Sequence, residues 1–336
     1  MKVALFFLVG EQFVSENWKI LFGCSRFQWR LRDFSFRGEV CVFMNRNMNR
    51  CKLPQELISI IIDDLNDDNR VLRMCSLVCS SWLQTSQCHL FRRIVLRPPN
   101  RRYDRRPGDI SYSQKLHRVL LESPHFATYI QELQVYEGNM VKDQDWIRTD
   151  QTLPLVLDML THLRRIELRR LRWSEYRPDL RQSICSVLER PSLVFLSIDD
   201  SDFAIMDDFT SLLSHAGGLT GISFTKIKTS QSFEEHPLLQ DPSQSIESKE
   251  PDFRHRRSHL LDMYLNLNYP KFFDWLLGPR SPWDVSRIHT LHISKFHPCY
   301  VNVVNRLLHA LSSSLRYFKL DVPMPWELLS RSSLFS

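Results

Sequence analysis

The chain has 336 residues, of which 43% are hydrophobic and 24% are charged, so it is long enough for about two domains with buried cores. Only 9 residues are glycine, well below the average usage of about 7%, and no glycine-rich dinucleotide or P-loop motif occurs, which disfavours nucleotide-binding enzymes. The formal net charge is +6, but residues 1–50 account for +4 of it, with 8 Lys and Arg against 4 Asp and Glu. The rest of the chain is nearly neutral, so its charge does not indicate nucleic acid as a partner.

Residues 1–50 combine aromatic residues and arginines without a sustained period, and we expect a poorly determined leader there. The first ten residues look superficially like a secretory signal. Their apolar stretch is only seven residues long, however, and no small-residue cleavage site follows it. A signal, an apolar strand and a leader that precedes a later start at Met44 or Met48 stay open as alternatives.

Residues 51–96 have the pattern of a small helical module. The run Leu53-Pro54-Gln55-Glu56 predicts the start of a helix, because proline is tolerated in the first turn and an acidic residue there favours the helix dipole. Apolar residues then recur at intervals of three and four, at Leu57, Ile58, Ile61, Ile62 and Leu65. Residues 66–69 predict a turn, and a second helical pattern follows at Val71, Leu72, Cys75, Val78, Cys79 and Trp82.

This module resembles the F-box family. The family's opening pattern, L-P-x-E-[LI]-[LI]-x-x-I-[LI]-x-x-L, is matched by residues 53–65. Its second half, an apolar pair followed by S-x-V-C-x-x-W, is matched by residues 71–82, and its closing aromatic region by residues 89–92. The resemblance covers about 44 of the 336 residues. It implies a three-helix module that docks on the S-phase-kinase-associated adaptor of a cullin–RING ubiquitin ligase.

The apolar residues of the module also favour a partner when they are considered without the family. About forty residues are too few for a self-sufficient core, and apolar residues on several sides of a helix indicate that a second protein covers one side. Trp82 and Cys79 are the candidates for internal packing. The residues that we expect to bind the adaptor are Leu53, Pro54, Leu57, Ile58, Ile61, Leu65, Leu72 and Val78.

Residues 97–114 predict a linker, because they contain two proline-rich turns and five arginines. Arg92 and Arg93 precede these five arginines, and the seven form a basic run from Arg92 to Arg106. The run is either a solvated loop or a surface for an acidic partner or nucleic acid. Because Tyr103 is its only aromatic residue, base stacking is not supported and nucleic acid is disfavoured.

From residue 115 to residue 330 the chain repeats the pattern apolar-x-x-apolar-x-apolar. The pattern occurs at Ile130/Leu133/Val135, Leu163/Ile166/Leu168, Leu193/Leu196/Ile198, Leu219/Ile222/Phe224, Leu260/Met263/Leu265, Ile288/Leu291/Ile293 and Leu315/Phe318/Leu320. Helical patterns lie between these strands, at residues 153–160, 179–188, 205–213, 272–277 and 301–311. A polar stretch, residues 229–257, predicts a loop insertion.

A short strand and a helix in each unit of 20–29 residues are typical of leucine-rich repeats. The predicted fold class is therefore α/β, mostly helical with parallel strands: a three-helix F-box followed by a curved leucine-rich-like solenoid. An ordinary α/β sheet stays open, because these repeats are long and lack the asparagine or cysteine that normally follows the strand. Gly217-Gly218 and Gly278 follow helical patterns, so we expect them to be left-handed helix ends.

The repeat pattern also predicts a target-binding face. Where the apolar positions of a strand face the core, the alternate positions point away from it. These positions are polar and mixed in charge, which suits a protein target, although an ordinary solvated face has the same composition. The residues that we expect to bind the target are Tyr136, Glu167, Arg169, Asp199, Tyr264, Asn266, His292 and Lys319.

No metal, cofactor or catalytic centre is predicted. Cys75 and Cys79 are expected on one apolar helical face as small buried residues, and His289 and His292 have opposite parity on a strand. No hydrolase or zinc-protease motif occurs. The eight cysteines are too sparse for a disulfide scaffold, so we expect reduced thiols and a cytoplasmic or nuclear protein with no membrane partner.

The resulting hypothesis is a substrate-receptor subunit that is not an enzyme. Its expected partners are the S-phase-kinase-associated adaptor, the cullin scaffold and a protein target that the sequence does not identify. Two alternatives belong to other classes: a scaffold of leucine-rich repeats without ubiquitylation output, and an α/β enzyme. The absence of catalytic motifs disfavours the enzyme.

Overall fold

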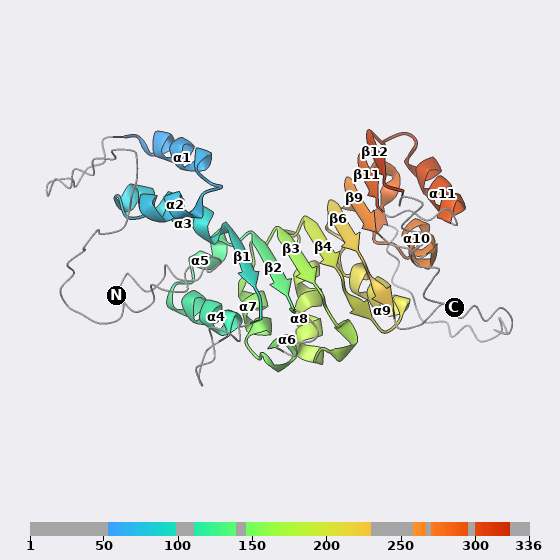
Figure 1. Cartoon of the computed structure of the whole chain (residues 1–336), viewed down its shortest axis with the longest axis horizontal. Coiled ribbons are helices and arrows are strands. Elements are labelled where there is room, and N and C mark those ends of the chain that lie inside the picture. Colours follow the sequence, from blue (N-terminus) through green and yellow to red (C-terminus); the bar gives the residue numbers. More distant parts are fainter. Residues whose placement is uncertain are drawn as a thin grey trace, which may run out of the picture. The chain divides into compact units, whose positions relative to one another are not determined.

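The computed structural model describes residues 53–98, 111–138, 146–229, 258–266, 270–294 and 300–322. It divides into two compact units, which we call the helical unit (residues 53–92) and the sheet unit (the described residues from 93 to 322). Helices and a parallel sheet make up the chain, which confirms the α/β class (Figure 1). The expected leader, most of the expected linker, nearly all of the polar insertion and the last residues lie outside the described residues.

The helical unit consists of α1 (Gln55–Asp64), α2 (Asn69–Cys75) and α3 (Ser80–Arg92). Pro54 directly precedes α1, and its carbonyl accepts the amide of Ile58 at 3.2 Å. The Asp68 side chain caps α2 by accepting the amides of Arg70 and Val71. Both α1 and α2 pack against α3. The buried apolar residues of this unit are Ile58, Ile62, Leu72, Cys75, Leu90 and Phe91.

One part of the predicted helical pattern is wrong. The pattern from Val71 to Trp82 is divided between two helices, because α2 ends at Cys75 and α3 begins at Ser80. The Ser76 hydroxyl donates to the Arg73 carbonyl at 2.6 Å, which satisfies a backbone acceptor in the last turn of α2. Cys75 and Cys79 therefore do not share a helical face, contrary to expectation.

The sheet unit is built on an eight-stranded sheet whose strands are all parallel and follow one another in chain order (Figure 1). Its strands are β1 (Arg93–Leu96), β2 (Glu132–Tyr136), β3 (Arg165–Arg169), β4 (Phe195–Asp199), β6 (Gly221–Thr225), β9 (Asp262–Asn266), β11 (Thr290–Ile293) and β12 (Tyr317–Leu320). The repeated apolar pattern determines the register: Leu133 pairs with Ile166, and Ile166 with Leu196. A register shift of one residue would expose every buried side chain of a strand.

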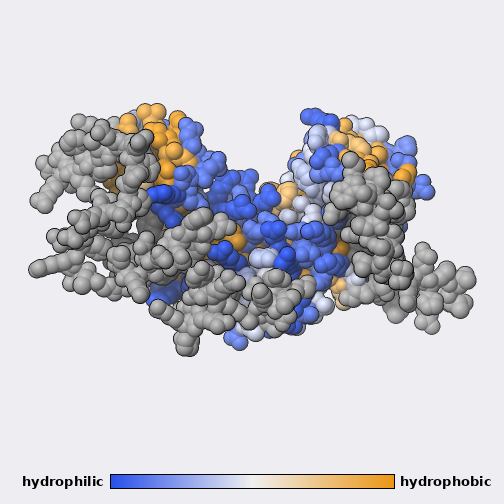
Figure 2. Space-filling model, in the orientation of Figure 1, coloured by the Kyte–Doolittle hydropathy of each residue, from blue (hydrophilic) through white to orange (hydrophobic). Residues whose placement is uncertain are grey.

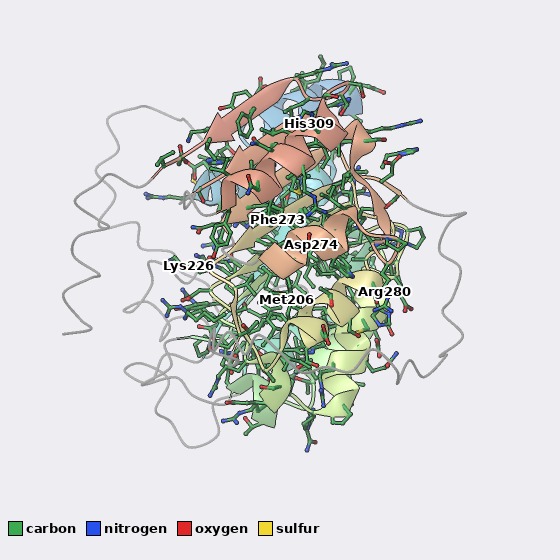
Figure 3. All side chains as sticks on the ribbon, turned by 90° about the vertical axis from the view of Figure 1, so that its right-hand side faces the viewer. Met206, Lys226, Phe273, Asp274, Arg280 and His309 are labelled. Carbon is green, nitrogen blue, oxygen red and sulfur yellow. The ribbon has the colours of Figure 1, made fainter. Side chains whose placement is uncertain are left out.

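Helices lie along one face of this sheet (Figure 1). They are α4 (Tyr112–Glu122), α5 (Phe126–Tyr129), α6 (Trp146–Thr149), α7 (Leu153–Met159), α8 (Pro178–Leu188), α9 (Met206–Ser214), α10 (Pro270–Leu277) and α11 (Val301–Leu311). Figure 3 views these helices from the β12 end of the sheet and labels Phe273 and Asp274 on α10. Phe273 is buried, whereas Asp274 is exposed and pairs with Arg306 of α11 at 2.8 Å.

The expected linker, residues 97–114, ends earlier than predicted, because α4 begins at Tyr112. Ser111 and Gln114 form a capping box, in which the Ser111 hydroxyl accepts the amide of Gln114 and the Gln114 side chain accepts the amide of Ser111. The helix therefore begins at Tyr112, inside the range that was expected to be linker.

Two small sheets lie beside the large one. β5 (Asp202–Phe203) pairs in parallel with β7 (Lys228–Thr229), and β8 (Ser258–His259) pairs with β10 (Trp283–Asp284). A cluster of rings, including Phe209, Phe224 and Phe272, fills the space between α9, α10 and the sheet. None of the helices in the described residues has the length and hydropathy needed to cross a bilayer.

The last strand departs from the expected burial pattern. In every other strand of the large sheet the two inward apolar side chains are no more than 6% exposed, whereas Phe318 and Leu320 of β12 are 40% and 36% exposed. Within the described residues no helix follows β12, so its apolar side is uncovered.

The left-handed backbone positions are also not those expected. Gly217, Gly218 and Gly278 do not have positive φ. Among the described residues other than glycine, positive φ values occur instead directly after three strands, at Arg170 after β3, Asp200 after β4 and Lys226 after β6, with φ of 58°, 50° and 50°. The strand ends, rather than the helix ends, make the sharp turns of the repeat.

Candidate functional site

The helical unit has an unusual number of exposed apolar side chains. We call them the apolar surface; they are Leu53, Leu57, Ile60, Ile61, Met74, Leu77 and Val78, between 39% and 76% exposed. Figure 2 shows hydrophobic residues gathered on the surface over α1. A small unit has little apolar area to leave in water, so exposure on this scale makes this surface a candidate for interaction with another protein.

The geometry of α1 explains why its apolar residues divide into two groups. Ile58 and Ile62, four residues apart, face inward and are fully buried. Leu57, Ile60 and Ile61 lie on other sides of the same helix, because neighbouring residues are about 100° apart around a helix axis. One stripe of α1 therefore makes the core of the unit, and the remaining apolar residues stay exposed.

The residues expected to bind an adaptor have different environments. Leu53, Pro54, Leu57, Ile61 and Val78 are exposed, and Leu65 is half-buried. Ile58 and Leu72 are fully buried, so they lie in the core and not on the surface as expected. Trp82 and Cys79, the candidates for the core, are only half-buried.

Sequence reasoning missed Met74 and Leu77 as members of the apolar surface. Met74 is the second-last residue of α2, and Leu77 lies two residues beyond its end, where the helical period no longer predicts a direction. The sequence feature that could have identified Met74 and Leu77 is their hydrophobicity beside polar residues at the end of a helix.

The second candidate site is the exposed face of the large sheet. Side chains on β1 to β6 form a connected row of polar contacts there. Gln134 donates to Glu167 at 3.5 Å, and Glu167 and Asp199 flank the Arg169 guanidinium at 3.6 Å and 3.0 Å. The Thr225 hydroxyl donates to Asp199. The structure thus brings together three of the residues expected to bind a target: Glu167, Arg169 and Asp199.

A second group of expected residues meets on β9, β11 and β12. The Tyr264 ring packs edge-on against the ring of His292, and His292 Nε2 lies 2.7 Å from Asp321 Oδ2. The Lys319 ammonium lies 3.3 Å from the same carboxylate. The hydrogen bond from His292 and the charge of Lys319 lower the pKa of Asp321 below its ordinary value. Asn266 lies at the end of β9, in register with Thr225.

The carboxyl ends of the strands form a charged rim. Tyr136 accepts a hydrogen bond from Arg170 at 3.0 Å, and Arg170 also pairs with Asp200 at 3.1 Å. Lys228 lies 3.0 Å from the other oxygen of Asp200. Burial raises the pKa of Asp200, but Lys228 and Arg170 outweigh it, so the net pKa lies below the ordinary value. Lys226, which follows β6 at this rim, is labelled in Figure 3.

A pocket of about 350 Å³ opens at the same rim. Its lining residues are Arg172, Ser174, Glu175, Asp202, Phe203, Lys228 and Thr229. The charges in it largely neutralise one another: Arg172 pairs with Glu175 at 3.0 Å, and Lys228 lies 3.9 Å from Asp202. Burial raises the pKa of Asp202. The lining includes no histidine or cysteine. Sequence reasoning missed this pocket, because distant segments form it.

Over the residues that the structure describes, no group of three or more His, Cys, Asp and Glu side chains could hold a metal ion. Cys75 and Cys185 are free thiols. Burial raises the pKa of Cys75 and Cys185, which makes these two thiols less reactive.

Comparisons with known proteins add no assignment: the sequence matches no protein-family model, and no curated protein shows significant similarity to it. Function must therefore be argued from the apolar surface and the polar sheet face.

Proposed function

We propose that the chain is the substrate-receptor subunit of a cullin–RING ubiquitin ligase. In this proposal the helical unit is an F-box that docks on the S-phase-kinase-associated adaptor and, through it, on the cullin. The sheet unit is a leucine-rich-like solenoid whose exposed face binds a protein target. The chain carries out no chemistry itself; it raises the effective concentration of target lysines at the transfer enzyme.

The observation that carries the proposal is the apolar surface. Burying one apolar side chain contributes about 1.5–3 kcal/mol, so several side chains of this surface suffice for a stable contact after the cost of association. Leu57 and Ile61 lie one helical turn apart and are exposed together. Pro54 fixes the entry to α1, which lowers the ordering cost of docking.

The sheet face supports the other half of the proposal. Each strand of the large sheet pairs with the strands before and after it in the chain, as stacked repeats do. Most of the outward positions of these strands are polar and partly exposed, which suits recognition of a protein segment more than a small apolar ligand.

The decisive experiment substitutes the apolar surface and leaves the core intact. Full-length chain with Leu57→Asp and Ile61→Asp is purified from cells and scored for the adaptor and the cullin. We expect both partners to be lost while the circular dichroism spectrum is retained. Deletion of residues 53–96 is a poorer test, because it also removes β1 from the sheet.

Leu121→Asp and Leu155→Asp provide the matched control. These leucines lie on α4 and α7 and are 62% and 49% exposed, against 47% and 39% for Leu57 and Ile61. The control therefore adds the same charge at apolar residues that are at least as exposed. Adaptor recruitment that survives in the L57D/I61D variant, or that is absent from the unsubstituted chain, refutes the proposal. Recruitment without target turnover would favour the alternative of a scaffold without ubiquitylation output.

A further inference from the structure

An arginine and a phenylalanine form a stacked pair on the exposed face of the large sheet. Arg165 on β3 is paired in register with Phe195 on β4. The Arg165 guanidinium carbon lies 4.2 Å from the centroid of the Phe195 ring. Arg165 is exposed and Phe195 is half-buried. This cation–π contact is the closest of those in the described residues.

The neighbouring strand makes room for the ring. Gly221 on β6 pairs in register with Phe195, and a Cβ atom placed on Gly221 would lie 2.6 Å from Phe195 Cδ2. The ring therefore leans over a position where every other strand of the sheet carries a side chain. A glycine at this position allows the ring to extend across the sheet beside Arg165.

Arg165 differs from the other arginines of this face in having unused donors. Arg169 is held by Glu167 and Asp199, and Arg170 by Asp200. The Arg165 backbone amide donates to the Gln131 carbonyl at 2.9 Å. Within the described residues, however, its guanidinium makes no hydrogen bond or ion pair, and its contact is with the Phe195 ring. Stacking holds the guanidinium plane while leaving its N–H donors open to a ligand.

A planar guanidinium held in this way fits an anionic group with two oxygens, because two parallel N–H donors match two oxygens about the same distance apart. We propose that Arg165, held by Phe195, binds a single carboxylate or phosphoryl group on a peptide segment of a partner protein that lies along the sheet face. The inference rests on the proposed function only in taking that protein to be the ligase target.

The charges around Arg165 favour a peptide over a nucleic acid. Glu132, Glu167 and Asp262 project from the same face, on β2, β3 and β9. These carboxylates repel a continuous chain of phosphates that runs across the strands. A peptide, in contrast, can present one anionic group to Arg165 and neutral or basic residues to the carboxylates.

Peptide libraries test the inference with full-length chain on a solid support. Three degenerate libraries have a fixed central phosphoserine, glutamate or alanine. We expect the two anionic libraries to be retained at least about tenfold more than the alanine library, as charge-assisted hydrogen bonds predict. Preference for phosphoserine over glutamate identifies the source of the anion. Equal retention of all three libraries would overturn the inference.

Variants connect the retention to the stacked pair. Arg165→Lys keeps the charge but loses the planar donors, and Phe195→Leu keeps apolar bulk but loses the stack; each should lower anionic retention about tenfold. Arg118→Lys on α4 is the control, because Arg118 is equally exposed and is already paired with Glu122. Unchanged retention with R165K contradicts the inference, as does tighter, Arg165-dependent binding of a random-sequence single-stranded oligonucleotide.

The sheet-face variants R165K and F195L, together with L57D/I61D of the helical unit, separate this inference from the proposed function. R165K and F195L should recruit the adaptor as the unsubstituted chain does, because both residues lie in the sheet unit. Loss of adaptor recruitment by L57D/I61D with intact anionic retention supports both ideas. Anion-dependent retention in a chain that never recruits the adaptor refutes the ligase proposal alone.

Discussion

Arg172 hydrogen-bonds both carboxylate oxygens of Glu137, a residue that is only 4% exposed. The Arg172 guanidinium donates to Glu137 Oε1 at 3.1 Å and 2.7 Å, and the Arg172 amide donates to Oε2 at 3.1 Å. The Tyr176 hydroxyl supplies a further hydrogen bond to Oε2 at 2.7 Å. This buried network connects the end of β2 to the segment that follows β3.

Arg172→Leu should therefore be among the most damaging single substitutions in the sheet unit. It leaves the Glu137 carboxylate buried without its cation, and we expect the free energy of unfolding to fall by about 3–5 kcal/mol. Urea denaturation followed by circular dichroism measures the change. Arg118→Leu, which breaks an exposed pair with Glu122, should cost no more than about 1 kcal/mol. Equal effects of the two variants would contradict the importance of burial.

Asp150 predicts how the stability of the sheet unit depends on pH. Burial alone raises the pKa of Asp150, but hydrogen bonds from Ser113, Thr152 and Ser111 outweigh it, so its pKa lies below the ordinary value. Because the folded pKa is lowered, the contribution of Asp150 to stability is present above about pH 4 and is lost as the pH falls further.

Asp150→Asn tests this linkage. We expect a lower urea midpoint at pH 7 and a smaller further loss between pH 5 and pH 2 than in the unsubstituted chain. Asp158→Asn, at an exposed aspartate on α7, is the control and should leave the acid-induced loss unchanged. An identical pH dependence for D150N and the unsubstituted chain would show that the carboxylate contributes nothing.

Gly221 should tolerate a methyl group poorly. Gly221→Ala brings Cβ into the space of the Phe195 ring, and such overpacking costs about 1–3 kcal/mol. Gly217→Ala is the control, because no atom lies within 4 Å of the added Cβ and φ is not positive there. In a double-mutant cycle, Phe195→Ala should remove most of the cost of G221A. If the free-energy costs of G221A and F195A simply add, the added methyl group does not clash with the Phe195 ring, and the prediction is contradicted.

The uncovered side of β12 predicts a contrast between two strands in register. Leu291 of β11 is fully buried and Phe318 of β12 is 40% exposed, although the two residues are register partners. Leu291→Ala should cost about 2–5 kcal/mol. Phe318→Ala should cost less than Leu291→Ala despite removing a larger side chain, as thermal melting of the two variants would measure. A larger cost for F318A would show that the side chain is covered in solution.

Strong periodicity made much of the fold predictable. The helix over residues 301–311 has the bounds that its apolar spacing predicts, and α7 and α8 agree to one residue at each end. The register of the large sheet was equally accessible, because each strand carries the same apolar pattern. These signals are local, and tertiary contacts reinforce them.

The sequence could not predict which way some side chains of a helix point, or which residues far apart in the chain come into contact. α1 is apolar on several sides, so the spacing did not reveal that Ile58 faces the core while Leu57 and Ile61 face outward. The stack of Arg165 on Phe195 depends on register across two repeats and on Gly221 in a third. The rim pocket joins Arg172, Asp202 and Lys228, which meet only after three strands are in place.

The uncovered edge at β12 also has a mechanical consequence. The strands are joined in chain order, and each holds only its two neighbours by backbone hydrogen bonds. A pulling force applied beyond β12 therefore meets the least buried strand first and can detach the strands one at a time, in reverse order. Unfolding by an ATP-driven translocase from that end should proceed in small steps at low force, while pulling at β1 and β12 together loads the whole ladder in series.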